Sequence, residues 1–188
     1  MEYMIRNHVA IVALQETKAT QTHSFIKKGF EFFFSGDSGS KHHGVGFVVA
    51  PQMRHLVVNF LGYNGRCCSI DLNIAPKPLQ LICAYAPSMV ADPVDDLSRK
   101  EQFWHFFGET FDRPPPHKQW CFLGDWNVRL STEQDPEEMA IGPDAWSKRQ
   151  VVMDPERDNA EYFLEFLIAH DLFHPQTFDQ PSLKHRIT

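Results

Sequence analysis

The sequence has no long apolar run, no signal-peptide pattern at its first residues and no excess of basic residues. No hydrophobic segment approaches the roughly 20 residues of a membrane-spanning helix, so we expect no membrane association. The N-terminus lacks the basic-then-apolar pattern of a secretory signal, which predicts an intracellular protein, nuclear or cytoplasmic. A net charge of −6 argues against a protein that holds nucleic acid by basic charge alone. A metal ion can still neutralise phosphate within an acidic site.

Cysteine motifs are also absent. Cys67, Cys68, Cys83 and Cys121 show no CxxC spacing, and Cys67 and Cys68 would point to opposite faces of a strand. We therefore interpret them as ordinary core and surface thiols and expect no disulfide.

What the chain does have is the composition of a globular domain. Its 188 residues are 43% apolar and include 16 phenylalanines, which suit a thick core between layers. We expect the clusters Phe32-Phe33-Phe34 and Phe103–Phe107 to be core rather than base-stacking surfaces.

Short apolar or alternating segments recur along most of the sequence. Strands are predicted at Val9–Leu14, Phe30–Phe34, Gly44–Ala50, His55–Leu61, Arg66–Ile74, Leu79–Tyr85 and Trp120–Leu123. Asn64-Gly65 is a strong hairpin signal between two of them. Helices are predicted at Glu2–Arg6, near Thr22–Lys28, after a capping box at Ser98–Glu101, and after a cap at Asp158, with a long loop over 129–154. This order predicts two sheets packed face to face with helices outside.

Polar residues follow three of these strands. Glu16 comes after Val9–Leu14, Tyr85 ends Leu79–Tyr85, and Asp125 and Asn127 come after Trp120–Leu123. If the three strands run parallel and side by side, their ends would gather these side chains at one rim. Such oxygen ligands suit Mg²⁺. His42 and His43, beside Gly44, are expected in an exposed loop rather than at a metal.

Four motifs carry a resemblance to a known superfamily. They are Leu14-Gln15-Glu16-Thr17-Lys18, Gly44-Val45-Gly46-Phe47-Val48, Ala84-Tyr85-Ala86-Pro87 and Gly124-Asp125-Trp126-Asn127. In this order they resemble the endonuclease/exonuclease/phosphatase superfamily, most of all the apurinic-endonuclease-like domains of non-LTR retrotransposons. The resemblance implies an α+β fold, a four-layer α/β/β/α sandwich of the DNase I-like type, with 1–188 as a single partial domain.

The resemblance also implies a chemistry and its residues. Glu16 matches the metal-ligand glutamate and Tyr85 the tyrosine that contacts the scissile phosphate. Asp125 matches the aspartate that orients or deprotonates the attacking water, and Asn127 the asparagine that stabilises the phosphate. The implied activity is Mg²⁺-dependent phosphodiester hydrolysis, with Mn²⁺ as a substitute ion, and the implied substrate is DNA, or else RNA.

The sequence departs from the family pattern at both ends. The family places an asparagine-bearing strand before the glutamate motif, and an aspartate and a histidine after the segment that Phe173–Phe178 resembles. We therefore expect a fold incomplete at both ends and an impaired activity, and whether the chain is an enzyme stays open. One alternative is an inactive, transposon-derived remnant or interaction module. Another is a relative of the RNA deadenylases or phosphoinositide phosphatases.

Overall fold

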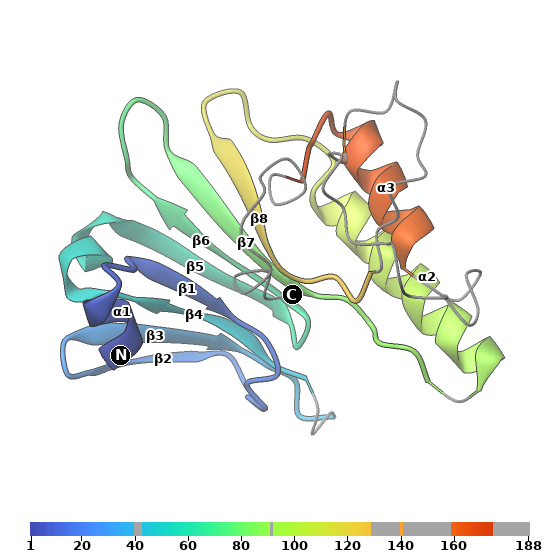
Figure 1. Cartoon of the computed structure of the whole chain (residues 1–188), viewed down its shortest axis with the longest axis horizontal. Helices are drawn as coiled ribbons and strands as arrows, with labels where there is room; N and C mark the ends of the chain where they lie inside the picture. The colour runs from blue at the N-terminus through green and yellow to red at the C-terminus, as the bar shows by residue number, and fades with distance from the viewer. Residues whose placement is uncertain (40–42, 91, 129–139, 141–158, 175–188) are drawn as a thin grey trace. The chain divides into compact units, whose positions relative to one another are not determined.

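The computed structural model describes all residues except 40–42, 91, 129–139, 141–158 and 175–188 (Figure 1). The chain divides into two compact units. Unit 1 comprises Met1–Tyr85 and Pro114–Asp125, and unit 2 comprises Ala86–Arg113 and the chain from Trp126 onward.

Unit 1 contains two four-stranded sheets. Its elements are α1 (Glu2–Arg6), β1 (Ile11–Leu14), β2 (His23–Lys27), β3 (Phe30–Ser35), β4 (Val45–Val49), the 3₁₀ helix η1 (Pro51–Leu56), β5 (Val57–Asn64), β6 (Cys67–Leu72), β7 (Leu79–Tyr85) and β8 (Gln119–Asp125). The first sheet has the order β1-β4-β3-β2 and is antiparallel throughout. The second has the order β5-β6-β7-β8 and is mixed, because β7 and β8 are parallel.

The two sheets share one buried hydrophobic cluster. Phe33, Phe47 and Val49 from the first sheet meet Ile70 and Cys83 from the second. On β6, the alternate residues Cys68, Ile70 and Leu72 all enter this cluster, as the sequence pattern predicts. A second, smaller cluster lies on the other face of the first sheet, where Met4 of α1 packs with Phe30, Val48 and Ala50.

The segment Thr22–Lys28 is a strand, so the prediction of a helix there is wrong. His23 and Phe25 of β2 lie directly opposite Phe34 and Phe32 of β3. The strands join through Lys28 and Gly29, with φ of 52° and 80°. Two consecutive residues of positive φ are what a tight type I′ hairpin requires. Because lysine, unlike asparagine, is not favoured at positive φ, Lys28-Gly29 is a weaker turn signal than Asn64-Gly65, which does join β5 to β6.

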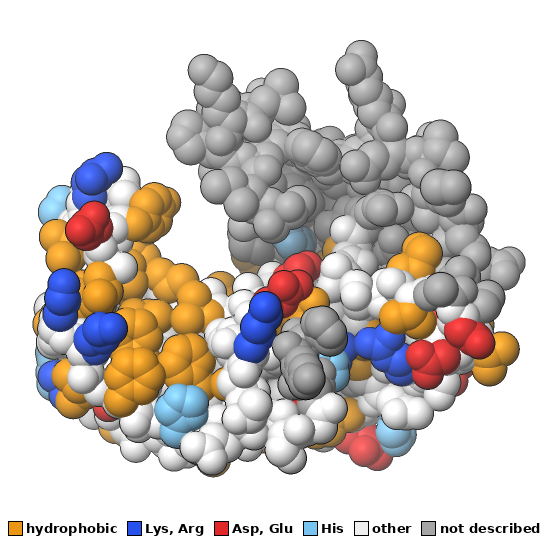
Figure 2. Space-filling view, turned by 90° about the horizontal axis from the view of Figure 1, so that it is seen from below, with side chains coloured by type: hydrophobic (Ala, Val, Ile, Leu, Met, Phe, Trp, Pro, Cys, Tyr) orange, Lys and Arg blue, Asp and Glu red, His pale blue; other side chains and the backbone are white. Residues whose placement is uncertain are grey.

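Phe33 enters the core between the sheets and Phe32 packs against the smaller cluster around Met4 and Phe30, whereas Phe34 does not enter the core between the sheets, contrary to expectation. Alternation along β3 sends Phe33 into that core and turns its neighbours to the opposite face. There Phe25 stacks on Phe32, with ring centroids 4.9 Å apart, and His23 lies 5.3 Å from Phe34. Figure 2 shows hydrophobic side chains gathered on this side of unit 1.

Unit 2 contains α2 (Pro93–Thr110) and α3 (Ala160–Ala169). The capping box predicted at Ser98 is wrong, because α2 begins five residues earlier, at Pro93. Asp92 is its N-cap and accepts hydrogen bonds from the backbone N–H groups of Val94 and Asp95. Proline at the first helical position is favoured because its missing N–H would have no partner there. Ser98 instead accepts a bond from Gln102 inside the helix.

Aromatic rings dominate the packing of unit 2. Phe107 of α2 lies 5.0 Å from Phe166 of α3 and 5.5 Å from Trp126, measured between ring centroids. Phe163, Phe166 and Leu167 of α3 are buried, whereas Ile168 is exposed. Asp158, the predicted 129–154 loop apart from the buried Ala140, and the segment beyond His174 lie outside the described residues.

Candidate active site

The candidate site of unit 1 begins with a hydrogen bond between the two sheets. Tyr85, at the end of β7, donates its hydroxyl to Oε1 of Glu16, which follows β1, over 2.8 Å. Asp125 ends β8 and is the direct register partner of Tyr85 across the parallel pair. The expectation of three parallel neighbouring strands is therefore right for β7 and β8 and wrong for β1, which lies in the facing sheet.

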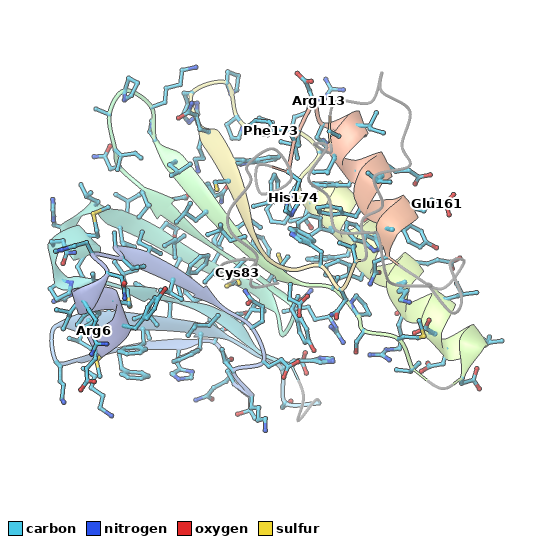
Figure 3. All side chains as sticks on the ribbon, viewed as in Figure 1. Arg6, Cys83, Arg113, Glu161, Phe173 and His174 are labelled. Atoms are coloured by element: carbon cyan, nitrogen blue, oxygen red, sulfur yellow. The ribbon has the colours of Figure 1, made fainter. Side chains whose placement is uncertain are left out.

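Residues just before Glu16 and Tyr85 reinforce this contact. Gln15 donates its Nε2–H to Cys83 Sγ over 3.2 Å, and the Cys83 thiol lies 3.4 Å from the carbonyl oxygen of Leu14. Cys83 is on β7, two residues before Tyr85 (Figure 3). The strand end that carries the glutamate is thus tied to the strand end that carries the tyrosine.

The environment of Tyr85 keeps its phenol protonated. Burial, then the hydrogen bond to Glu16 and the charge of that carboxylate, raise the pKa of Tyr85 to about 12. The charge of Asp125 acts in the same direction, and the Arg66 guanidinium opposes it. At neutral pH the side chain is therefore a neutral hydrogen-bond donor.

Arg66 is a residue that sequence reasoning missed. Its guanidinium carbon lies 5.1 Å from the centroid of the Tyr85 ring, and its Nη1–H donates to the backbone oxygen of Tyr85 over 3.0 Å. Its Nη2 lies 2.8 Å from Nε2 of His43. His43 is thus half-buried against an arginine rather than exposed in a loop, and His42 lies outside the described residues. The only sequence signal for Arg66 was its place directly after Asn64-Gly65.

Two glycines of the four motifs are required by close backbone approach. A Cβ on Gly124 would overlap the carbonyl oxygen of Ala84 on the neighbouring strand β7. Gly44 has a φ of +111°, and a Cβ there would overlap the Thr17 side chain. Both glycines let the chain pass close to a segment that bears a candidate site residue.

Asn127 belongs to unit 2, where its position is fixed by hydrogen bonds. Its Nδ2–H donates to the carbonyl oxygen of Ala86 over 2.8 Å, and its φ is +48°. Asn159, which sequence reasoning also missed, is buried and donates to the carbonyl oxygens of Pro87 and Asn127. Trp104 of α2 donates its indole N–H to Asn159 Oδ1 over 3.0 Å.

The donor set of Glu16 and Asp125 fits Mg²⁺ chemically. Among the described residues, no three His, Cys, Asp or Glu side chains come together as a metal cluster. Mg²⁺ usually binds through one or two carboxylates, with water and substrate phosphate completing the octahedron. Glu16 and Asp125 are both exposed carboxylates, and the hydrogen bond from Tyr85 fixes one oxygen of Glu16.

Comparison with solved structures identifies the fold. The AP endonuclease LMAP from Leishmania major matches 89% of this chain and 59% of its own, with a TM-score of 0.61 and 12% sequence identity. The chain has the fold of the endonuclease/exonuclease/phosphatase superfamily. The endonuclease domain of TRAS1, a telomere-specific non-LTR retrotransposon, also matches, over 83% of this chain and 58% of its own, with 13% identity and a TM-score of 0.43.

Sequence comparison finds partial matches to one protein from two species. Craniofacial development protein 2 of Bos taurus is 23% identical over 133 residues, which cover 71% of this chain and 22% of that protein. The protein of the same name from Tragulus javanicus is 21% identical over 133 residues. The chain thus spans about a fifth of the length of these relatives. No family model matches the sequence, and none of the helices in the described part of the chain has the length and hydropathy of a membrane span.

Proposed function

We propose that the chain is an endonuclease/exonuclease/phosphatase domain that hydrolyses phosphodiester bonds of DNA with Mg²⁺, of the type found in retrotransposon endonucleases. The observation that carries the proposal is the contact of Tyr85 with Glu16, beside Asp125, on this fold. The proposal includes residues 1–188 as one domain with the four-layer α/β/β/α arrangement of that superfamily.

Each proposed residue has a role that suits its chemistry. Glu16 would hold the ion, which supplies charge stabilisation to a phosphoryl oxygen when bound. Tyr85, neutral because its pKa is raised to about 12, donates a hydrogen bond to the phosphate. Asp125 accepts the proton of the attacking water. To Asn127, whose Nδ2–H donates to the Ala86 carbonyl oxygen, we assign stabilisation of the phosphate.

Plasmid nicking tests this proposal. The chain is incubated with supercoiled plasmid in Mg²⁺, in Mn²⁺ and in EDTA, and the nicked fraction is followed with time. We expect metal-dependent nicking that falls at least about 100-fold in Glu16→Gln and in Asp125→Asn, since a single acid/base group contributes about 10²–10⁴-fold. Glu109→Gln is the matched control, because Glu109 is 70% exposed and lies on α2.

A Glu16→Gln variant that nicks as fast as the unaltered chain would show that the site assignment is wrong. The rival hypothesis, an inactive remnant or interaction module, predicts no metal-dependent nicking by the chain at all. The net charge of −6 favours this rival slightly, because it weakens nonspecific attraction to DNA.

A further inference from the structure

We propose that Arg66 is a positioning residue that holds Tyr85 in register with Glu16, a role that rests on the proposed function of that pair. Arg66 touches Tyr85 in three ways. Its guanidinium carbon lies over the ring, 5.1 Å from the centroid, its Nη1–H donates to the Tyr85 carbonyl oxygen, and its own carbonyl oxygen accepts the Tyr85 backbone N–H over 2.9 Å. Both the ring and the backbone of the tyrosine are therefore fixed by one residue.

Arg66 is itself held from the other side. A guanidinium can only donate hydrogen bonds, so Nε2 of His43, 2.8 Å from Nη2, must be the acceptor. The ring proton of a neutral His43 then sits on Nδ1, which faces Oδ2 of Asp37 at 3.6 Å. The Asn64 side chain also accepts the backbone N–H of Arg66 over 2.8 Å.

The backbone joins Arg66 to the segment that carries Glu16. Gly44 donates its N–H to the carbonyl oxygen of Gly65 over 2.7 Å. Gly44 and His43 in turn accept hydrogen bonds from the backbone N–H groups of Thr17 and Lys18, each over 2.9 Å. These hydrogen bonds connect the segment that follows Glu16 to residues 43–44, residues 43–44 to the β5–β6 turn, and the turn to Tyr85. The hydrogen bond from Tyr85 to Glu16 closes the circuit.

The packing leaves little freedom at the β5–β6 turn. Gly65 is buried, and a Cβ there would overlap Oδ2 of Asp37. The turn therefore fits closely against Asp37 and His43. Lysine could supply the charge of Arg66, but it lacks the planar fork that stacks on a ring while donating in two fixed directions. The geometry points to arginine for its shape as well as its charge.

The test compares Arg66→Lys with Arg113→Lys, since Arg113 is 88% exposed and far along the chain in unit 2. Tyrosines are replaced by 3-fluorotyrosine, and the Tyr85 signal in the ¹⁹F NMR spectrum is assigned with Tyr85→Phe. We expect Arg66→Lys, and not Arg113→Lys, to shift or broaden the Tyr85 signal. Nicking by Arg66→Lys should fall about 10–100-fold in kcat, because small displacements of a reacting group have effects of that order.

A double variant separates positioning from a general loss of structure. In the Tyr85→Phe background there is no hydroxyl to position, so adding Arg66→Lys should lower nicking less than about 2-fold further. An unchanged Tyr85 signal in Arg66→Lys would overturn the proposal, whether or not the chain nicks DNA. If the unaltered chain does not nick DNA while the signal still shifts, the proposed function fails and the positioning of Tyr85 by Arg66 stands.

Discussion

The buried amide of Asn159 allows a quantitative prediction about unit 2. In Asn159→Leu the side chain keeps nearly the same size but loses both donors and its acceptor. The Pro87 carbonyl oxygen and the Trp104 indole N–H each lose their bond to Asn159, at 2.8 Å and 3.0 Å, in a site where Asn159 is 1% exposed. A buried polar group left without a partner costs about 1–3 kcal/mol, so the free energy of unfolding should fall by about 2–6 kcal/mol.

Urea unfolding followed by tryptophan fluorescence measures this loss. The matched control is Asn73→Leu, which alters an exposed asparagine and should stay within about 0.5 kcal/mol of the unaltered chain. Asn159→Asp keeps an acceptor for Trp104 but turns an oxygen toward the Pro87 carbonyl, so it should also destabilise. An Asn159→Leu variant as stable as Asn73→Leu, with the same urea dependence, would refute the idea that this amide organises unit 2.

Three further outcomes follow from charges and ionisation. Lys100→Met should lower the free energy of unfolding by about 3–5 kcal/mol, because it leaves the fully buried carboxylate of Asp96 without the ammonium 2.9 Å away; urea unfolding checks this. Lys118→Ala should cost only about 1 kcal/mol in the same assay, because its pair with Asp71 stays partly solvated. Since the pKa of Tyr85 is raised from 10 to about 12, the folded state holds that proton more tightly, so stability should decline between pH 10 and 12. That part of the decline should be missing in a Tyr85→Phe melting series; an identical decline in both proteins would contradict the pKa assignment.

Local sequence patterns predicted most strands of unit 1 well. The alternation of β6 and the Asn64-Gly65 turn each depend on neighbouring residues, and both are confirmed. The β2 strand was missed because the local sequence pattern of this segment resembles a helix. Its strand conformation depends on aromatic pairs with the neighbouring strand β3, which a local pattern does not contain. The sequence pattern placed the start of α2 at Ser98 because a Ser-x-x-Glu pattern looks the same in the middle of a helix as at its N-terminus. The helix in fact begins at Pro93, with Asp92 as its N-cap.

In the candidate site too, local sequence patterns predicted some residues, while others depend on contacts between segments distant in the sequence. Position at the end of a strand singled out Glu16, Tyr85 and Asp125, and the structure places Tyr85 against both of the others. Neither Arg66 nor Asn159 could be found in this way. Each makes its contacts with residues far away in the sequence. Arg66 and Tyr85 are separated by 19 positions, and Asn159 and Pro87 by 72.

Two of the candidate site residues, Glu16 and Asn127, have left-handed backbone conformations. Their φ angles are 53° and 48°, in the left-handed region, and that of Lys18 is 58°. A non-glycine residue there costs roughly 1–2 kcal/mol, somewhat less for asparagine. The hydrogen bonds of Lys18 N to His43 O and of Asn127 Nδ2 to Ala86 O offset part of that cost. His8, Lys28 and Asp171, which lie outside the candidate site, also have positive φ, so the proposed roles of Glu16 and Asn127 rest on their contacts rather than on backbone strain.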